Sequence, residues 1–439
     1  MKLIKRVAKS SAGTAAILVA LRLSGAAAGM AFALLMARTM GAQEMGQAVT
    51  ALAAAMFLSS LTTGSSEPGA PRFITQYLEH GDPGSARGFI RLNWRVFTGL
   101  LPLSMIGAIA IYFHGGLAPE FALVPIAAAV MGALRIGAAH ALGFGRVVVS
   151  VAPGAVIRQF CVLGLFALYA AAIGAPSPAM VVAFLIAGAL CAFTVQQAAL
   201  RPQYNTLMSG PAQMTHWRTW LTTGWFLGPT LLFIEYSREV LLFFSAFGVP
   251  PETVATLSVA TAITGFARFG IAAVNQSVTP ALSRAIARGD STEMERLIFG
   301  GNLLKLAGTI LALIVLVVFG EHIMAVFGPA FIPAAALFPV LMVEMFALAV
   351  LGPGSNVLAL SGHHRLLPVA AFAALMALAA GSAAAGALYG AVGIAWTAGL
   401  VWTFWSLFLA FVAQRRLGFG ITLFHGIARR LRGSPRNAA

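Results

Sequence analysis

Long apolar runs follow one another through almost the whole chain, and each is about long enough to cross a bilayer. A spanning helix needs roughly 20 such residues. Only 9% of the residues are charged, against about 25% in an average soluble domain. The sequence therefore predicts an all-α polytopic membrane protein with little mass outside the bilayer. Hydropathy predicts twelve spans, at residues 12–37, 46–66, 94–113, 119–143, 153–173, 177–199, 219–244, 253–280, 297–319, 334–360, 366–389 and 392–413.

The polar stretch 201–218 separates the first six predicted spans from the last six. It divides the chain into an N-terminal lobe (1–200) and a C-terminal lobe (219–415), which a basic tail (416–439) follows. In that tail Phe424, Ile427 and Leu431 recur at helical spacing beside arginines. This pattern is typical of an amphipathic helix at a membrane surface.

A weak internal repeat relates the two lobes. Residues 71–82 and 280–290 both run from a proline through a short helical segment to Gly-Asp, and a basic helix start follows each copy. The copies lie six predicted spans apart. Because six is even, both lobes have the same orientation, and the repeat is parallel. Transporters built this way carry their substrate site between the repeats, so we expect a central cavity between two six-helix lobes.

The basic residues predict the orientation and the surroundings of the chain. If the N-terminus is cytoplasmic, most of the 28 Lys and Arg residues fall on the cytoplasmic side, with Arg158 and Lys305 counted among them, and only Arg38 falls in an outside loop. This asymmetry indicates cytoplasmic N- and C-termini. The net charge of +15 then has anionic membrane lipids as its partner, and no nucleic acid is needed to explain it.

Arginines inside apolar spans are the strongest indication of a function. Arg22 and Arg268 lie near mid-span, one in each half, and Arg135 and Arg238 are also intramembrane. Each such arginine costs roughly 2.5–3.5 kcal/mol on insertion scales, so the four are expected to share a solvated space or to meet an anion. A guanidinium fork donates two hydrogen bonds at once, which suits phosphate. We therefore predict a cationic cavity that receives an anionic substrate, with Arg22, Arg268 and Arg135 as binding residues.

Polar and acidic residues in the spans supply further candidates. Glu235 and Glu239 flank Arg238 on one face of the seventh span, so an ion pair there leaves one carboxylate over. Glu344 is a lone carboxylate in the tenth span. These three acids are candidates for ion coupling, and a structural network near the outer interface is the alternative for the first two. Asn275 lies two helical turns after Arg268 and is expected to line the same cavity.

The sequence shows no catalytic or cofactor site. It contains no HExxH, GxSxG or GxxxxGK[ST] motif and no Cys/His ligand cluster, so we expect no enzyme, no metal and no cofactor. His140 is interpreted as a helix-packing histidine. Cys161 and Cys191 are interpreted as small buried apolar residues.

Several short segments occur in the order found in one transporter family. The first is Ala37-Arg38-Thr39-Met40-Gly41, and the others are 44–47, 280–290, 326–331, 362–365 and 390–395. In these segments the chain resembles the Wzx-type oligosaccharide flippases and polysaccharide exporters of the MOP (multidrug/oligosaccharidyl-lipid/polysaccharide) superfamily, whose fold is MATE-like. The resemblance implies twelve helices in two lobes around a central cavity that opens alternately to each side of the membrane.

The resemblance also implies a function. The substrate would be an undecaprenyl-pyrophosphate-linked oligosaccharide, moved from the cytoplasmic to the periplasmic leaflet of the bacterial inner membrane for surface polysaccharide assembly. In related lipid II flippases, cavity arginines of the first and eighth helices contact the pyrophosphate, and Arg22 and Arg268 fall on those helices. Polysaccharide polymerase and chain-length machinery would be further partners. The alternatives are a cation- or proton-coupled drug antiporter of the MATE type and a membrane polysaccharide polymerase or ligase.

Overall fold

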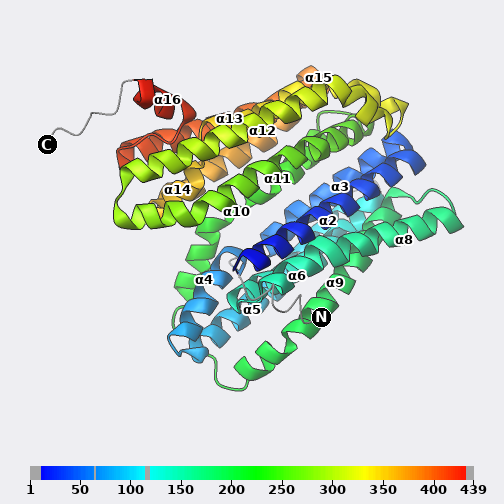
Figure 1. The fold of residues 1–439 in the computed structure, drawn as a ribbon. Helices are drawn as coiled ribbons and strands as arrows, with labels where there is room; N and C mark the ends of the chain where they lie inside the picture. The colour runs from blue at the N-terminus through cyan, green and yellow to red at the C-terminus, as the bar shows by residue number, and fades with distance from the viewer. Residues whose placement is uncertain (1–10, 64–65, 114–118, 432–439) are drawn as a thin grey trace. The chain divides into compact units, whose positions relative to one another are not determined.

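The computed structural model describes residues 11–63, 66–113 and 119–431, and every regular element in those residues is a helix (Figure 1). The Lys and Arg residues that lie outside the described part are Lys2, Lys5, Arg6 and Lys9 near the N-terminus and Arg432 and Arg436 in the tail. The elements are α2 (Ser11–Thr39), α3 (Gly41–Thr62), α4 (Ser66–Glu79), α5 (Pro83–Phe113), η1 (Pro119–Ala122), α6 (Val124–Gly143), α7 (Val147–Ala152), η2 (Pro153–Ile157), α8 (Arg158–Ala172), α9 (Pro178–Leu207), α10 (Trp217–Ser245), α11 (Pro251–Arg288), α12 (Ser291–Ala325), η3 (Pro329–Leu337), α13 (Phe338–Val350), α14 (Gly354–Leu360), η4 (His364–Leu366), α15 (Leu367–Leu417) and α16 (Leu423–Leu431).

The prediction of an all-α polytopic membrane protein is confirmed. In the described residues, nine helical stretches are long and apolar enough to cross a membrane. One of these is α15, which contains both the eleventh and the twelfth predicted spans. Gly390 breaks it with a backbone conformation (φ 60°, ψ −146°) that interrupts the helix. The third and seventh predicted spans correspond to α5 and α10.

Close packing divides the chain into two compact units, Met1–Phe243 and Phe244–Ala439. The boundary lies one helix later than the predicted connector at 201–218, because α10 packs into the first unit. Trp220 of α10 donates a hydrogen bond to the hydroxyl of Tyr77 at 2.8 Å, and Phe243 stacks on Phe57. The helix α9 also continues to Leu207, so the non-helical connection is shorter than predicted. The two six-helix lobes stay a prediction.

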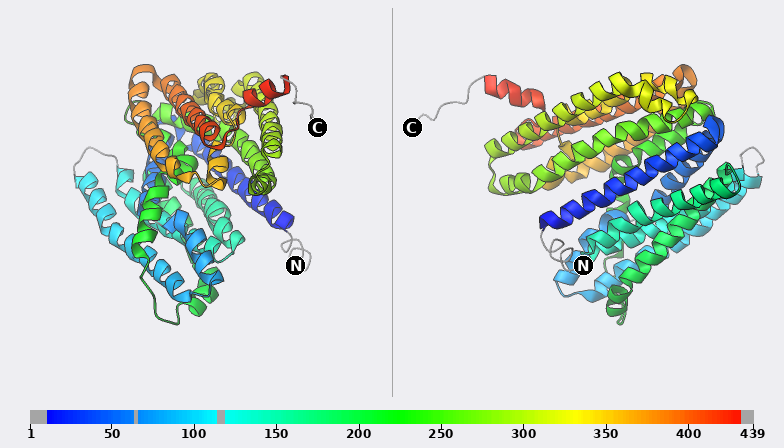
Figure 2. Two further views of the ribbon diagram at one scale, coloured as in Figure 1. Left: turned by 90° about the vertical axis from the view of Figure 1, so that its left-hand side faces the viewer. Right: turned by 45° about the vertical axis from the view of Figure 1, so that its right-hand side comes forward.

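Small side chains hold the core of the first unit together. Helix α6 packs against α3, α4 and α9 (Figure 2), and the buried cluster that joins α6 to α3 and α9 is rich in alanine. Lipid chains are as apolar as the helices, so association in a membrane relies on close backbone approach, which small residues permit. Gly132 of α6 shows this constraint, because a Cβ there would lie 2.3 Å from the hydroxyl oxygen of Thr62.

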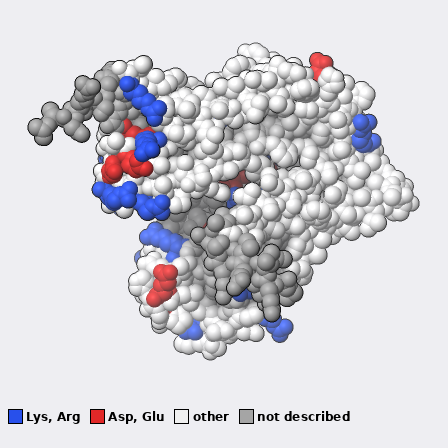
Figure 3. Space-filling model, viewed as in Figure 1, with Lys and Arg blue, Asp and Glu red and all other residues white. Residues whose placement is uncertain are grey.

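Helices on the outside of each unit present apolar side chains. On α12, Leu304, Leu311 and Val317 are exposed, as expected for side chains that contact lipid. The face drawn in Figure 3 is almost uncharged over the long helices, and its charged side chains gather near helix ends. Helix α16 carries exposed Phe424 and Leu431, so the amphipathic helix predicted for the tail is present, and its membrane contact remains a prediction.

The two copies of the sequence repeat adopt the same local structure. Gly81 (φ 69°) and Gly289 (φ 70°) end their helices in the left-handed conformation, which glycine adopts without strain. Asp82 then caps α5 by accepting from the Ser85 amide at 3.0 Å. Asp290 caps α12 by accepting from the Glu293 amide at the same distance. The second copy differs from the prediction in one respect, because α11 does not end at its proline but continues to Arg288.

Two further predictions from the sequence are wrong. Cys161 and Cys191 are not buried, because they lie on the outer sides of α8 and α9 with their sulfurs 3.5 Å apart. Residues 320–333, which separate the ninth and tenth predicted spans, are largely helical, because α12 extends to Ala325 and η3 begins at Pro329.

The caps at Asp82 and Asp290 predict matched effects on stability. Asp82→Ala and Asp290→Ala should each cost about 1 kcal/mol, because each leaves helix-end amides without an acceptor. Asp82→Asn should retain most of the cap. Thermal unfolding of the purified protein in detergent tests this, and an alanine variant as stable as the parent would contradict it.

The Asp82 cap should also weaken in acid. Asp82 lies between α4 and α5, and its hydrogen bonds with Ser85 hold the pKa of its carboxyl below the usual value. A lowered pKa stabilises the folded state above the unfolded pKa of about 3.9, and this contribution is lost as the pH falls below that value. The difference between the parent and Asp82→Asn should therefore be larger at neutral pH than in acid.

Gly25 and Gly29 of α2 have GxxxG spacing but different surroundings. A Cβ at Gly25 would lie 2.1 Å from the Ala155 carbonyl oxygen, whereas a Cβ at Gly29 would lie 3.7 Å from the Gln159 side chain. We expect Gly25→Ala to destabilise the first unit by roughly 1–3 kcal/mol through overpacking. Gly29→Ala is the matched control and should be neutral or slightly stabilising. Equal thermal midpoints for the two variants would contradict this packing.

Candidate substrate site

The first unit holds an arginine inside its core. Arg135 projects from α6 with 8% of its side chain exposed, and one guanidinium nitrogen pairs with the Glu67 carboxylate of α4. The other donates to the Ser59 hydroxyl of α3 at 3.0 Å. The guanidinium carbon of Arg135 also lies over the Tyr236 ring of α10, 4.1 Å from the ring centroid. No pattern in the sequence points to this carboxylate partner, because Glu67 lies 68 residues away and just beyond the second predicted span.

A second arginine of the first unit lies deeper than the sequence predicts. The charge count places Arg158 on the cytoplasmic side, although the residue falls within the fifth predicted span. In the structure it follows the π-helical turn η2, and its Nε donates to the Gly154 carbonyl at 3.0 Å. Its Nη1 lies 3.9 Å from the sulfurs of Met56 and Met131. Among the described residues, no carboxylate lies within ion-pair distance of Arg158.

Arg135 and Arg158 reach the same side of the first unit. Met131 precedes Arg135 by one turn of α6, so the two side chains share a face of that helix. Met56 and Ser59 are related in the same way on α3. We call these two arginines, with Glu67 and Tyr236, the Arg135 cluster. Glu67 pairs with Arg135, and Glu235 and Glu239 of α10 lie close enough to attract Arg135 and Arg158 respectively. π-Helical turns such as η2 are frequent at functional sites.

The second unit contains a similar combination of groups. Arg268 of α11 pairs with Glu344 of α13, and its guanidinium lies 4.7 Å from the ring centroid of Trp402 on α15. We call these three residues the Arg268 cluster. Glu344 is therefore not a lone carboxylate as predicted, because α11 and α13 pack together and bring the two charges into contact. About a third of the Arg268 side chain remains exposed (34%).

The remaining predicted site residues have different surroundings. Arg22 is exposed on α2, and it makes no ion pair with any described residue. Glu239 pairs with its neighbour Arg238 at 3.6 Å, while Glu235 is exposed on the same helix. Asn275 lines a small pocket in the second unit, and Arg268 is not among the residues that line it.

His140 is confirmed as a packing residue. It is fully buried, and its ring nitrogens lie 3.1 Å from the Asn93 amide and 2.9 Å from the Tyr204 hydroxyl. In the described part of the chain, no three His, Cys, Asp or Glu side chains come together in a way that could hold a metal ion.

Comparison with known proteins bears on the fold. The sequence matches no family model, and no curated protein matches it. Solved structures do resemble it. An inward-facing multidrug resistance MATE family transporter of the MOP superfamily superposes with a TM-score of 0.72 at 11% identity, covering 91% of this chain and 98% of that one. Lipid II flippase MurJ in an inward closed conformation gives a TM-score of 0.70 at 13% identity, covering 96% and 94%.

This chain has the fold of the MOP superfamily transporters. A third neighbour, a MOP superfamily transporter from Pyrococcus furiosus, gives a TM-score of 0.55 at 12% identity and covers 91% of this chain and 98% of that one. The similarity extends over nearly the whole length of both chains in each case. The predicted superfamily fold is thus supported, while the Wzx-type assignment remains a proposal.

The Arg135 cluster predicts a measurable stability cost. Glu67→Gln should lower the free energy of unfolding by about 3–5 kcal/mol, because it leaves a buried guanidinium without its carboxylate. The double variant Glu67→Gln with Arg135→Met should recover much of that loss. The matched control is Glu293→Gln, which breaks the exposed pair with Arg296 and should cost about 1 kcal/mol or less. Equal effects of Glu67→Gln and Glu293→Gln in thermal unfolding would contradict the buried pair.

Proposed function

We propose that the protein is a flippase for an undecaprenyl-pyrophosphate-linked oligosaccharide in the bacterial inner membrane, working by alternating access with both termini in the cytoplasm. The observation that carries this proposal is the basic excess among intramembrane side chains. Arg22 and Arg158 have no carboxylate partner among the described residues, and Arg268 keeps part of its surface exposed. Such a set of guanidinium groups favours a doubly phosphorylated lipid head over a cationic drug.

The fold alone does not choose between these substrates. The multidrug MATE transporter and the lipid II flippase superpose on this chain almost equally well. For the Pyrococcus furiosus transporter, the reverse polarity of its binding pocket suggests a different function. The charge of the binding site is therefore the feature that separates the two substrate classes, and the intramembrane arginines of this chain support a positively charged site. A drug antiporter remains the second candidate because the same fold serves multidrug transporters.

Glu344 gives the proposal a way to couple a proton. Its carboxylate forms an ion pair with the guanidinium of Arg268, so a pyrophosphate has to compete with Glu344 for that cation. Protonation of Glu344 would remove its charge and release Arg268 to the phosphate oxygens. Glu239, paired with Arg238, and Glu235 are the other coupling candidates, now on α10. In this scheme Arg22, Arg158 and Arg268 bind the pyrophosphate. Arg135 is paired with Glu67 and has a structural role.

Reconstitution tests the proposal directly. Proteoliposomes carrying a fluorescent polyprenyl-pyrophosphate oligosaccharide should show faster exchange between leaflets than protein-free vesicles, and a neutral polyprenyl glycoside should not be moved. Arg268→Gln, Arg22→Gln and Arg158→Gln should each reduce the rate about tenfold or more, since one charge-assisted contact is worth about 1.5–3 kcal/mol. Arg296→Gln, on an exposed side chain, is the matched control.

The same vesicles distinguish the alternatives. Proton-driven uptake of a cationic dye without lipid movement would support the drug antiporter. Elongation of the sugar chain would support a polymerase or ligase. Full activity in the Arg22→Gln and Arg268→Gln variants, with normal amounts of protein in the membrane, would refute the proposed pyrophosphate site.

A further inference from the structure

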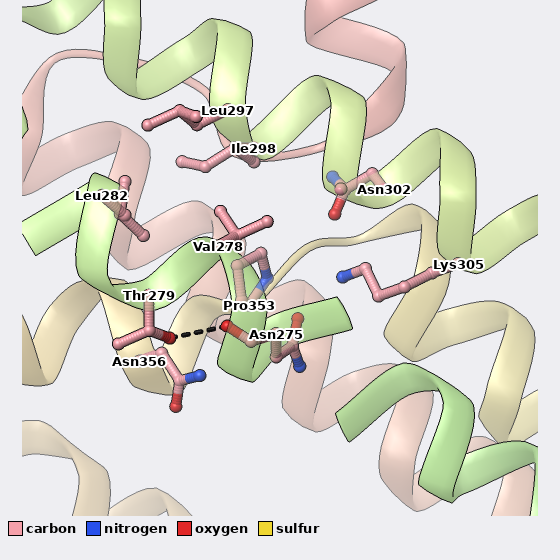
Figure 4. Close-up of a pocket in the computed structure, with 11 residues that line it drawn as sticks. Asn275, Val278, Thr279, Leu282, Leu297, Ile298, Asn302, Lys305, Pro353 and Asn356 are labelled. Carbon is pink, nitrogen blue, oxygen red and sulfur yellow. Dashed lines mark hydrogen bonds between the residues drawn. The ribbon is translucent and has the colours of Figure 1, made fainter. Parts of the chain in front are cut away.

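A small pocket with several polar side chains in its wall lies inside the second unit, and Arg268 is not among its lining residues. It lies between α11, α12 and the break that separates α13 from α14, and its volume is about 10 Å³, counted as the space open to the centre of a water molecule. Asn275, Asn302, Lys305 and Asn356 are among its lining residues, and Figure 4 shows the Lys305 ammonium directed into the space beside Asn275 and Pro353. A cavity of about this size holds one water, so this one suits an ion or a water.

Lys305 sits at the end of a broken membrane helix. Its Nζ donates to the Leu348 carbonyl at 3.2 Å, in the last turn of α13. The chain then breaks at Gly352 (φ 88°) and Pro353, which has no amide hydrogen to donate. The terminal carbonyls of α13 therefore carry partial negative charge that the ammonium stabilises. In secondary transporters, the free carbonyls of broken helices coordinate a sodium ion or a proton.

The pocket also contains an oxygen without a partner. Asn302 is fully buried, and its amide nitrogen donates to the Ile421 carbonyl at 2.9 Å. That bond fixes the orientation of the amide, and its Oδ1 accepts no hydrogen bond from the described residues. A buried acceptor in this state costs free energy, which a proton donor on a cation or a water in the pocket would recover.

The residue type at position 305 is significant. Beyond Lys9 the sequence contains one lysine, and every other Lys or Arg position there is an arginine. Arginine stays protonated in proteins, whereas a buried lysine can give up its proton. Lys305 is 3% exposed. The chain thus places its one lysine beyond position 9 at the helix break.

No carboxylate compensates this charge within the pocket. The elements packed against α12 are α11, α13, η3 and α16, and none of their described ionisable side chains, nor any other on α12, lines the pocket. Those side chains are Glu252, Arg268, Arg284, Arg288, Glu293, Glu295, Arg296, Glu321, His322, Glu344, His425 and Arg430.

We propose that this pocket is a proton-binding site, in which the Lys305 amino group takes the place of the cation that other transporters bind at a broken helix. The amine lone pair accepts a proton from hydronium, which leaves water, and the ammonium then holds the end of α13. Loss of the proton to water leaves the oxygens of the pocket without a cation and loosens that end. The use of this step in transport rests on the proposed function, whereas the proton binding itself does not.

The first experiment measures protonation without any substrate. The protein is labelled with ¹⁵N-lysine and reconstituted in liposomes, and the Nζ signal of Lys305 is assigned by its absence in Lys305→Met. The expected result is conversion of this signal between the ammonium and amine forms while the protein remains folded, at a pH different from that of Lys2, Lys5 and Lys9. A Lys305 signal that stays in one form until the protein unfolds would overturn the proposal.

The second experiment tests for a metal cation in place of the proton. Thermal midpoints of the parent and of Lys305→Gln are compared in sodium chloride and in choline chloride. The proposal expects no sodium effect on the parent, because the ammonium fills the cation position. A sodium-dependent rise in the parent would overturn it and would assign the pocket to sodium. Arg296→Gln, on the same helix, controls for the loss of a positive charge.

The third experiment addresses coupling. With the lipid-linked substrate, an imposed pH gradient should accelerate the parent and Arg296→Gln at least several-fold. It should accelerate Lys305→Arg clearly less, because the charge at position 305 is then fixed and only the proton at Glu344 remains to couple. Equal acceleration of Lys305→Arg and the parent would overturn the coupling role. If no variant moves the lipid at all, the proposed function fails, and the lysine spectrum still decides whether the pocket binds a proton.

Discussion

A charged side chain inside a bilayer needs compensation, and the way each unit provides it organises the interior of this protein. Arg135 pairs with Glu67 and Arg268 pairs with Glu344, and in both cases the guanidinium also lies against an aromatic ring. Each arginine contacts side chains of two or three other helices, so these contacts form only when all of those helices are packed together. The ion pairs thus specify how the helices pack, in addition to any net stability that they contribute.

Two inner cations that form no ion pair among the described residues, Arg158 and Lys305, lie beside interruptions in a helix. Arg158 follows the π-helical turn η2 and donates to a backbone carbonyl of that turn. Lys305 donates to a carbonyl at the end of α13, where the chain breaks before α14. Backbone carbonyls are the acceptors available in an apolar interior, and an interrupted helix exposes more of them than a continuous one. The same interruptions are where a membrane helix can bend, so these cations lie where the proposed transport cycle needs movement.

The sequence predicts the fold well and the sites only in part. Apolar runs of spanning length are a local property, so they predict nearly all the helices, and residues 71–82 and 280–290 predict the Gly-Asp helix junctions. Partnerships across the chain are not local. Glu67 lies close to the end of a predicted span, and Glu344 looks isolated until α13 packs on α11. A count of charges by segment ignores depth, and it therefore places Arg158 and Lys305 on the cytoplasmic side although both fall within predicted spans.

Compensation and function place opposite demands on the same arginines. An arginine that is fully paired stabilises the resting protein but has little affinity left for a substrate, and an arginine without a partner binds anions but is costly to bury. The described residues divide along this line. Arg135 is 8% exposed and held by a carboxylate, a serine and a ring, whereas Arg268, beside a carboxylate and a ring, is 34% exposed. A phosphate can therefore compete more easily for Arg268, and the carboxylate it displaces there is one that a proton can neutralise. Under the proposed function, anion binding and proton uptake are linked at that pair, because both act on the same charge.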